Sequence, residues 1–175
     1  MQKVIGFLSG VLLFSLLVSF LSPAKEKINW ISLSELKASY NKDPKPILID
    51  VYTSWCGWCR EMDRKTYTNK KLADYINEHY YAVKYDAESK DAVEFNGVKY
   101  TFQPEYNMNG LALYLLHNEP GYPTTVFLSG MDAKPAPIPG YMTPPEIEAP
   151  IRFFGDGIYK TKNYREFMDS FKPGW

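Results

Sequence analysis

The sequence of 175 residues contains few cysteines, few histidines and no excess of either charge. Its two cysteines, Cys56 and Cys59, cannot form a framework of several disulfides or supply a metal site that needs four thiolates. Lysine plus arginine number 20 and aspartate plus glutamate number 20, so the formal net charge is zero. There is no long basic run, so we expect neither a nucleic-acid partner nor electrostatic attraction to an anionic membrane. The whole cysteine content lies in one Cys-x-x-Cys window, which is the feature that most needs a physical reason.

Residues 1–24 differ in composition from the rest of the chain. Lys3 is their only charge, Val4 to Leu21 is mostly apolar, and the small residues Ser22 and Ala24 have the spacing of a cleavage site. This layout is typical of a secretory signal peptide. Because the apolar stretch is long for such a peptide, an uncleaved membrane anchor is the alternative. We therefore expect an extracytoplasmic, periplasmic protein that is either released by cleavage or tethered by its amino end.

Residues 25–175 are expected to form one domain in which strands alternate with helices, as in α/β layered folds. Strands are predicted at residues 46–52, 80–86, 124–128 and 137–140. Helices are predicted at residues 33–40, 58–67, 70–79, 109–117, 144–154 and 163–171. Pro150 is expected to kink the fifth of these helices. Residues 88–122 form a long connection in which Asn96-Gly97 predicts a two-residue β-hairpin.

Cys56 and Cys59 lie between a predicted buried strand and a predicted helix. The amino end of a helix offers unpaired N–H groups and a positive partial charge of about half a unit, which would stabilise a thiolate at Cys56. Cys59, one turn further on, should be more buried and keep its proton. The spacing therefore separates an attacking thiolate from a resolving thiol within bonding distance.

Three alternative roles for the cysteine pair are less well supported. A structural disulfide across so short a loop stabilises by about 2 kcal/mol, against about 3 kcal/mol for a fifteen-residue loop, so distant cysteines would serve stability better. A zinc site would need two more ligands, and the two histidines, His79 and His117, lie on separate segments without finger-like spacing. A c-type haem needs histidine directly after the second cysteine, where Arg60 stands.

Asp50 stands within an otherwise apolar predicted strand, six residues before Cys56. A carboxylate there is costly to bury, and its pKa should be raised. From that position Asp50 could exchange a proton with Cys59 through a water molecule while a mixed disulfide is resolved. The alternative is a capped or solvent-facing carboxylate at an edge position.

Pro123 follows Tyr122 at the start of a predicted strand. A cis peptide bond there would direct the backbone of Tyr122 toward the disulfide, where its N–H and C=O could pair with an extended substrate segment. The spacing alone favours an ordinary trans proline at a strand start.

Two motifs and a buried acid together resemble the thioredoxin superfamily: Asp50, Trp55-Cys56-Gly57-Trp58-Cys59 and Gly121-Tyr122-Pro123-Thr124. Residues 60–67 more closely resemble the extracytoplasmic thioredoxin-like domains of the DsbD carboxy-terminal type. The resemblance covers most of residues 28–171. It implies a three-layer sandwich, with a central mixed sheet flanked by helices and a hairpin-containing insertion before the strand that follows Pro123.

The resemblance also assigns roles to residues. It makes Cys56 the nucleophile, Cys59 the resolving thiol, Asp50 the buried carboxylate and Pro123 a cis-proline, while Trp55 would shield the disulfide. Substrate contact is expected at Trp55, Gly57, Trp58, Tyr122 and Pro123. No metal is expected, and no cofactor besides the redox-active disulfide.

This sequence departs from the thioredoxin pattern in three ways, one of which is the longer connection at residues 88–122 with its added hairpin. Trp58 stands where thioredoxin has proline and disulfide isomerases have histidine, and this residue influences the redox potential. The basic partner that some thioredoxins place near the buried aspartate has no match, since Lys84 is offset.

These features predict an exported thiol–disulfide oxidoreductase, and the resemblance favours a reductase. The expected partners are protein disulfides or dithiols and a membrane electron donor or oxidant, and we expect a monomer. The alternative is a non-enzymatic binding module, in which the two cysteines hold Cu(I) or form an inert disulfide beside a protein-docking surface.

Overall fold

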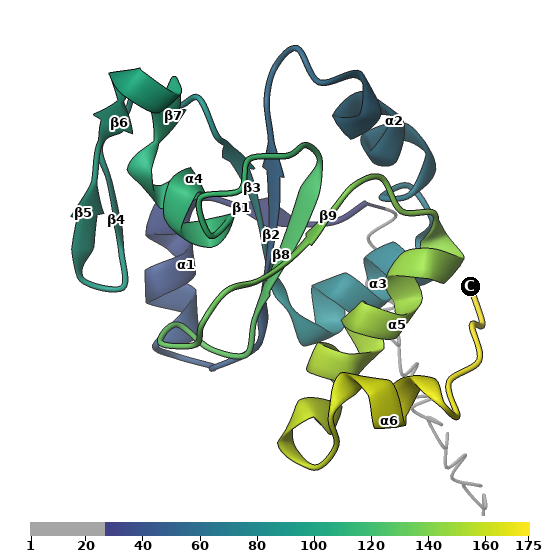
Figure 1. The fold of residues 1–175 in the computed structure, drawn as a ribbon. Helices are drawn as coiled ribbons and strands as arrows, with labels where there is room; N and C mark the ends of the chain where they lie inside the picture. Colours follow the sequence, from purple (N-terminus) through teal and green to yellow (C-terminus); the bar gives the residue numbers. More distant parts are fainter. Residues whose placement is uncertain (1–26) are drawn as a thin grey trace, which may run out of the picture.

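A five-stranded mixed sheet forms the centre of the computed structural model, which describes residues 27–175 (Figure 1). Its strands are β1 (Trp30–Ile31), β2 (Ile47–Tyr52), β3 (Tyr81–Asp86), β8 (Thr124–Leu128) and β9 (Ala136–Pro139), and their spatial order is β1-β3-β2-β8-β9. Strand β3 runs parallel to β1 and β2, whereas β8 runs antiparallel to β2 and β9. The mixed sheet predicted from the sequence is therefore confirmed.

The amino-terminal prediction cannot be followed in the structure, because residues 1–24 lie outside the described residues. Within residues 27–175, no helix combines the length and apolar character needed to cross a membrane.

Helices cover both faces of the sheet (Figure 1). Helices α1 (Leu33–Tyr40) and α4 (Gly110–Leu115) pack on one face, where Leu36 and Leu111 meet Ile49 of β2. Helices α2 (Gly57–Lys65), α3 (Lys70–His79) and α5 (Pro144–Gly155) pack on the other, where Met62 and Ile76 join the same core as Leu48. The short helices η2 (Ile158–Lys160) and α6 (Tyr164–Met168) follow and pack against α5. The predicted three layers are present.

The central strand β2 explains why the chain folds around this sheet. Four of its apolar side chains are fully buried: Ile47, Leu48, Ile49 and Val51. Because side chains alternate along a strand, Ile49 and Val51 face α1 and α4, whereas Leu48 and Asp50 face the layer of α2, α3 and α5. This alternation places the one acidic residue of β2 on the same side as the helix that carries the cysteines.

The connection between β3 and β8 contains the predicted hairpin. Strands β4 (Val93–Phe95) and β5 (Val98–Tyr100) pair antiparallel around Asn96 and Gly97, whose φ angles are 49° and 74°. Two successive positive φ values are what a tight primed turn requires, and asparagine and glycine adopt them readily. The sequence did not predict the second pair, β6 (Phe102–Gln103) and β7 (Met108–Asn109), or the one-turn helix η1 (Pro104–Tyr106) between them, because two-residue strands leave no periodic pattern.

Some helix predictions need correction. Helix α4 is shorter than predicted because His117 and Asn118, which follow its C-cap Leu116, adopt positive φ angles of 54° and 62°. Helix α6 ends at Met168 rather than at residue 171. Helix α5 continues through Pro150, which removes one backbone donor, and the kink expected there stays a prediction.

Candidate active site

Cys56 and Cys59 form a disulfide at the point where the chain passes from β2 into α2. Cys56 is the N-cap of α2, and its Sγ accepts a hydrogen bond from the backbone N–H of Cys59 at 3.0 Å. The Cys56 N–H in turn donates to the carbonyl oxygen of Thr53 at 3.2 Å, which fixes the turn before the helix. A sulfur at an N-cap lies in the positive field of the helix end, so this position favours a thiolate when the bond is reduced.

The expected difference in exposure between the two cysteines is absent. Cys56 and Cys59 are each 4% exposed, so the prediction that Cys59 is the more buried residue is wrong for this disulfide-bonded state. The prediction concerned two separate thiols, whereas the two sulfurs are bonded to each other here.

The two tryptophans of the motif surround this buried disulfide with exposed aromatic surface. Trp55 and Trp58 are each 63% exposed. The Trp55 ring lies edge-on to Tyr122, with centroids 5.9 Å apart, and the Trp58 ring lies against Tyr141 at 5.5 Å. Gly57 is exposed between them, and a Cβ added there would have Nη2 of Arg60 as its nearest neighbour at 3.9 Å. Trp55, Gly57, Trp58 and Tyr122 were predicted from the sequence as contact residues. Tyr141 was not, and its one signal is its place just after a predicted strand.

Tyr122 and Pro123 lie at the start of β8, and the peptide bond between them is cis. The Pro123 carbonyl accepts a hydrogen bond from the Gly140 N–H at 2.8 Å. Within residues 27–175, neither the N–H nor the C=O of Tyr122 has a hydrogen-bond partner in the protein. Burial, followed by the charges of Glu88 and Asp86, raises the pKa of the Tyr122 hydroxyl to about 12, so this half-buried side chain stays neutral.

Asp50 is buried in the sheet, as its sequence context predicted. The residue is 1% exposed, and its Oδ1 accepts a hydrogen bond from the Tyr67 hydroxyl at 3.2 Å. Its other oxygen, Oδ2, lies 3.3 Å from Nζ of Lys84. The prediction that Lys84 is offset from this carboxylate is therefore wrong. Strands β2 and β3 pair with Asp50 opposite Lys84, a register that single-strand patterns do not specify.

Lys84 also binds a second carboxylate, which sequence reasoning missed. Its Nζ lies 2.5 and 2.6 Å from the two carboxylate oxygens of Asp63 on α2, closer than it lies to Asp50. The same ammonium lies 5.0 Å from the ring centroid of Tyr52 and 5.6 Å from that of Trp30. Lys84 therefore forms ion pairs with two carboxylates, and its shorter contacts are with Asp63.

This charge arrangement sets the protonation of Asp50. Burial raises the pKa of the Asp50 carboxyl to about 6, Lys84 opposes the rise, and the negative charge of Asp63 adds to it. Burial also raises the pKa of the Tyr67 hydroxyl well above its usual value, so Tyr67 remains a hydrogen-bond donor to Asp50. Burial lowers the pKa of Lys84, but Asp50 and Asp63 outweigh that effect, so the amine remains charged.

Asp50 and Cys59 belong to the same layer of the molecule. Cys59 and Met62 are the buried residues of α2, and Met62 packs in the core on the α2 side of the sheet. Asp50 faces this side too, because it alternates with Ile49 and Val51, which face the other. The buried carboxyl of Asp50, with a pKa of about 6, and the buried Cys59 thus lie on one side of β2.

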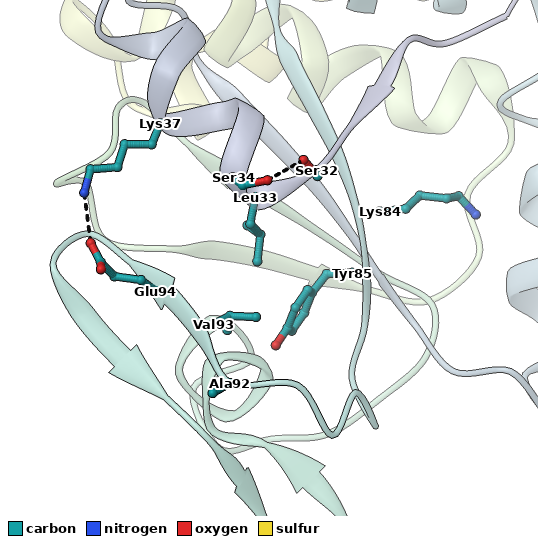
Figure 2. A pocket seen from close by; sticks show the side chains of 9 residues that line it. All are labelled: Ser32, Leu33, Ser34, Lys37, Lys84, Tyr85, Ala92, Val93 and Glu94. Carbon is teal, nitrogen blue, oxygen red and sulfur yellow. Dashed lines mark hydrogen bonds and ion pairs between the residues drawn. The ribbon is translucent and has the colours of Figure 1, made fainter.

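A pocket of about 560 Å³ lies elsewhere, between α1 and the β4–β5 hairpin (Figure 2). The exposed ion pair of Lys37 and Glu94, 2.9 Å apart, spans part of its wall. The Tyr85 hydroxyl is buried here without a hydrogen-bond partner among residues 27–175. Figure 2 shows the ammonium of Lys84 directed away from the other lining side chains, so it belongs to the Asp50 site. The site residues predicted from the sequence all lie outside the lining of this pocket.

Comparison with solved structures gives the same fold. A DsbH oxidoreductase shares 19% identity and a TM-score of 0.54, over 79% of this chain and 92% of the other. A thioredoxin-fold protein from Helicobacter pylori shares 24% identity and a TM-score of 0.52, over 71% and 78% of the two chains. Identities this low establish the common fold and nothing about substrates.

Sequence comparisons place the chain in a family. An uncharacterized protein of Caenorhabditis elegans is 31% identical over 75 residues, which is 42% of this chain but 10% of that protein. The matched region therefore spans about a tenth of the length of this relative. The family model for thioredoxin-like DsbH proteins, described as a protein of unknown function, DUF255, matches residues 17–153. Because this match covers most of the chain, the protein belongs to the DsbH (DUF255) family of the thioredoxin superfamily.

Proposed function

We propose that this protein is an exported thiol–disulfide oxidoreductase that reduces disulfide bonds in other proteins. A thioredoxin-like fold with a Cys56–Cys59 pair supports an oxidoreductase-type function. The observation that carries the proposal is the position of this pair, at the amino end of α2 and on the same side of β2 as the buried Asp50.

The reaction begins from the reduced protein. The Cys56 thiolate attacks one sulfur of the substrate disulfide, and the other substrate sulfur leaves as a thiolate that takes a proton from water. Cys59 then loses its proton and attacks the Cys56 sulfur, which releases the second substrate thiolate. This second thiolate also takes a proton from water, so the substrate has gained two electrons and two protons and is a dithiol, and the protein is left with the Cys56–Cys59 disulfide. An electron donor restores the dithiol.

Asp50 is the proposed acceptor of the Cys59 proton. An acid whose pKa is about 6 is mostly ionised at neutral pH and is still basic enough to take a proton from a neighbouring thiol through water. Tyr67 and Lys84 hold the two carboxylate oxygens in place. Asp50 thus supplies a buried base beside the apolar core on the α2 side of the sheet.

The backbone of Tyr122 is the proposed contact for an extended substrate segment. Its N–H and C=O lack partners within the described residues, and its ring touches Trp55 beside the disulfide. Two backbone hydrogen bonds would align the segment without selecting its side chains.

The reductive direction and the location rest on the sequence. The likeness of residues 60–67 to the DsbD carboxy-terminal type favours reduction, with a membrane protein as electron donor. The composition of residues 1–24 favours export, and disulfides persist in oxidising compartments.

The test is insulin reduction by the wild-type protein and by Cys56→Ser and Cys59→Ser variants. We expect turnover only in the wild type, and a mixed disulfide that accumulates only with Cys59→Ser, detected as an intact-protein mass. Equal turnover in the wild type and Cys56→Ser would refute the proposal. Retention of one Cu(I) per reduced wild-type chain, without exchange activity, would support the binding-module alternative. The mass of the protein isolated from its native host reports whether residues 1–24 are removed.

A further inference from the structure

Trp58 leaves most of its side chain in solvent beside the disulfide. It is 63% exposed, and its aromatic contact is with Tyr141, at a centroid distance of 5.5 Å and an interplanar angle of 43°. Tryptophan is on average a highly buried residue, and tryptophan and tyrosine are enriched among the residues that dominate protein interfaces. The open face of this pair is therefore an unfilled contact surface next to Cys59.

The segment that carries Tyr141 is held on both sides. The Gly140 N–H donates to the carbonyl of Pro123 at 2.8 Å, and the buried Thr66 hydroxyl donates to the carbonyl of Met142 at 2.5 Å. Gly140 has a φ of 99°, a conformation that residues with a Cβ rarely adopt. The segment is already fixed to the end of α2 and to the Pro123 loop. Binding of a ligand would therefore cost little conformational entropy in this segment.

Tyr141 and Tyr122 leave the sheet at the same end. Strands β8 and β9 pair with Thr124 opposite Pro139. Tyr122 lies two residues before Thr124 and Tyr141 two residues after Pro139, just outside the two strands. Each tyrosine contacts one tryptophan of the Cys-x-x-Cys motif. An extended protein segment bound across the disulfide would therefore contact one aromatic pair on each side of its cysteine.

The two aromatic pairs differ in their charged neighbours. Asp86 ends β3 opposite Tyr52, and β2 pairs its Val51 with Thr124 of β8, so Asp86 lies at the end of the sheet where Tyr122 precedes β8. The Glu88 N–H donates to Oδ1 of Asp86 at 3.0 Å, which holds the two acids together, and after burial both charges act on the pKa of the Tyr122 hydroxyl. Among residues 27–175, no basic side chain lies within ion-pair distance of either acid. Charge complementarity at this end therefore calls for a basic partner residue.

We propose that Trp58 and Tyr141 form a docking platform for an apolar side chain of the cysteine-bearing partner segment, and that Asp86 and Glu88 select a basic residue at its other end. The partner is thus an extended protein segment in which a disulfide-bonded cysteine has an apolar neighbour on one side and a basic neighbour on the other. This inference rests on the proposed function and adds to it the substrate class.

The test uses the reduced full-length protein and short peptides whose single cysteine is bonded to 2-mercaptoethanol. The peptides carry phenylalanine or serine two positions from the cysteine, on either side, and lysine or glutamate on the opposite side. Each rate constant is divided by that for bis(2-hydroxyethyl) disulfide, which is too small to span the platform. We expect the wild type to prefer phenylalanine over serine by about tenfold, a typical effect of one interface aromatic. Tyr141→Ala should abolish this preference and Tyr141→Phe should keep it.

A second variant tests the role of Asp86 and Glu88. The double substitution Asp86→Asn, Glu88→Gln should remove a preference for lysine over glutamate peptides, and added salt should weaken that preference in the wild type. Tyr106→Ala is the matched control, because Tyr106 is 62% exposed and lies in η1, outside the site. It should leave both preferences unchanged.

The outcomes separate the two proposals. A wild-type protein that fails to react with bis(2-hydroxyethyl) disulfide contradicts the proposed function itself. A wild-type protein that reacts with this reagent but treats phenylalanine and serine peptides alike overturns the platform. The same holds if Tyr141→Ala keeps the full preference. If circular dichroism shows that Tyr141→Ala is unfolded, the wild-type peptide comparison and Tyr141→Phe still decide the matter.

Discussion

Replacing Asp50 with asparagine should remove a specific pH dependence of stability. Burial raises the pKa of this carboxyl from 3.8 to about 6 in the folded protein. The folded state therefore binds the proton more tightly than the unfolded state, and ΔG of unfolding falls as the pH rises through the interval between these two values. A shift of about two pKa units corresponds to about 3 kcal/mol. The wild type should lose about this much stability relative to Asp50→Asn between about pH 4 and about pH 7.

Urea unfolding of the oxidised proteins, followed by tryptophan fluorescence, measures this difference. The oxidised form is chosen because the bonded cysteines do not titrate. Asp74→Asn is the matched control, since Asp74 forms an exposed ion pair with Lys70 on α3. Its pH profile should run parallel to that of the wild type. A difference between wild type and Asp50→Asn that stays constant over this pH range would refute the assignment of the buried charge.

The two neighbours of Asp50 should move the midpoint of this profile in opposite directions. Asp63→Asn removes a negative charge and frees Lys84 for Asp50, so the pKa of Asp50 should fall, and the loss of stability should be smaller and complete at lower pH. Lys84→Met removes the cation that favours ionisation, so the pKa should rise. A midpoint that does not move in Asp63→Asn would contradict the sharing of Lys84 between the two acids.

Three further predictions concern the chemistry and the fold. Resolution of the mixed disulfide should slow as the pH falls below about 6, where Asp50 binds a proton, and stopped-flow mixing of the wild type with a peptide disulfide should show this dependence, which Asp50→Asn should lose. Leu48→Ala should lower the free energy of unfolding by about 2–5 kcal/mol because Leu48 is fully buried in β2, and urea unfolding checks this value. Gly97→Ala should cost about 1 kcal/mol because the φ of Gly97 is 74° in the hairpin turn, whereas alanine at exposed Lys99 should have a smaller effect in the same assay.

Most of the fold could be predicted from the sequence because its main elements carry strong local signals. Strand β2 is a run of apolar residues between turn signals, and the capping boxes at Ser32 and Thr143 mark where α1 and α5 begin. The Asn96-Gly97 pair similarly identified the hairpin. Elements of two or three residues, such as β1 and β7, have no such pattern and depend on pairing with distant strands.

Only the site residues that carry a local sequence signal could be predicted. Asp50 was identified because it is the one charged residue in an apolar strand, β2. The Cys-x-x-Cys motif was identified because it lies where this strand is followed by a helix, α2. Lys84, Asp63 and Tyr141 reach the site through strand register and loop packing. Register depends on how two strands pair, which is a tertiary property.

Two features of this protein oppose the stability of the fold, and both occur at one site. A carboxylate on the central strand destabilises the folded protein at neutral pH, and two tryptophans that expose most of their surface forgo the stabilisation that burial would give. A chain selected for stability alone would have an apolar residue in place of Asp50 and smaller polar residues around Cys56. Departures from local rules concentrate where function requires them. Their convergence on one disulfide therefore favours thiol exchange with a bound partner over a structural cross-link, which neither feature would improve.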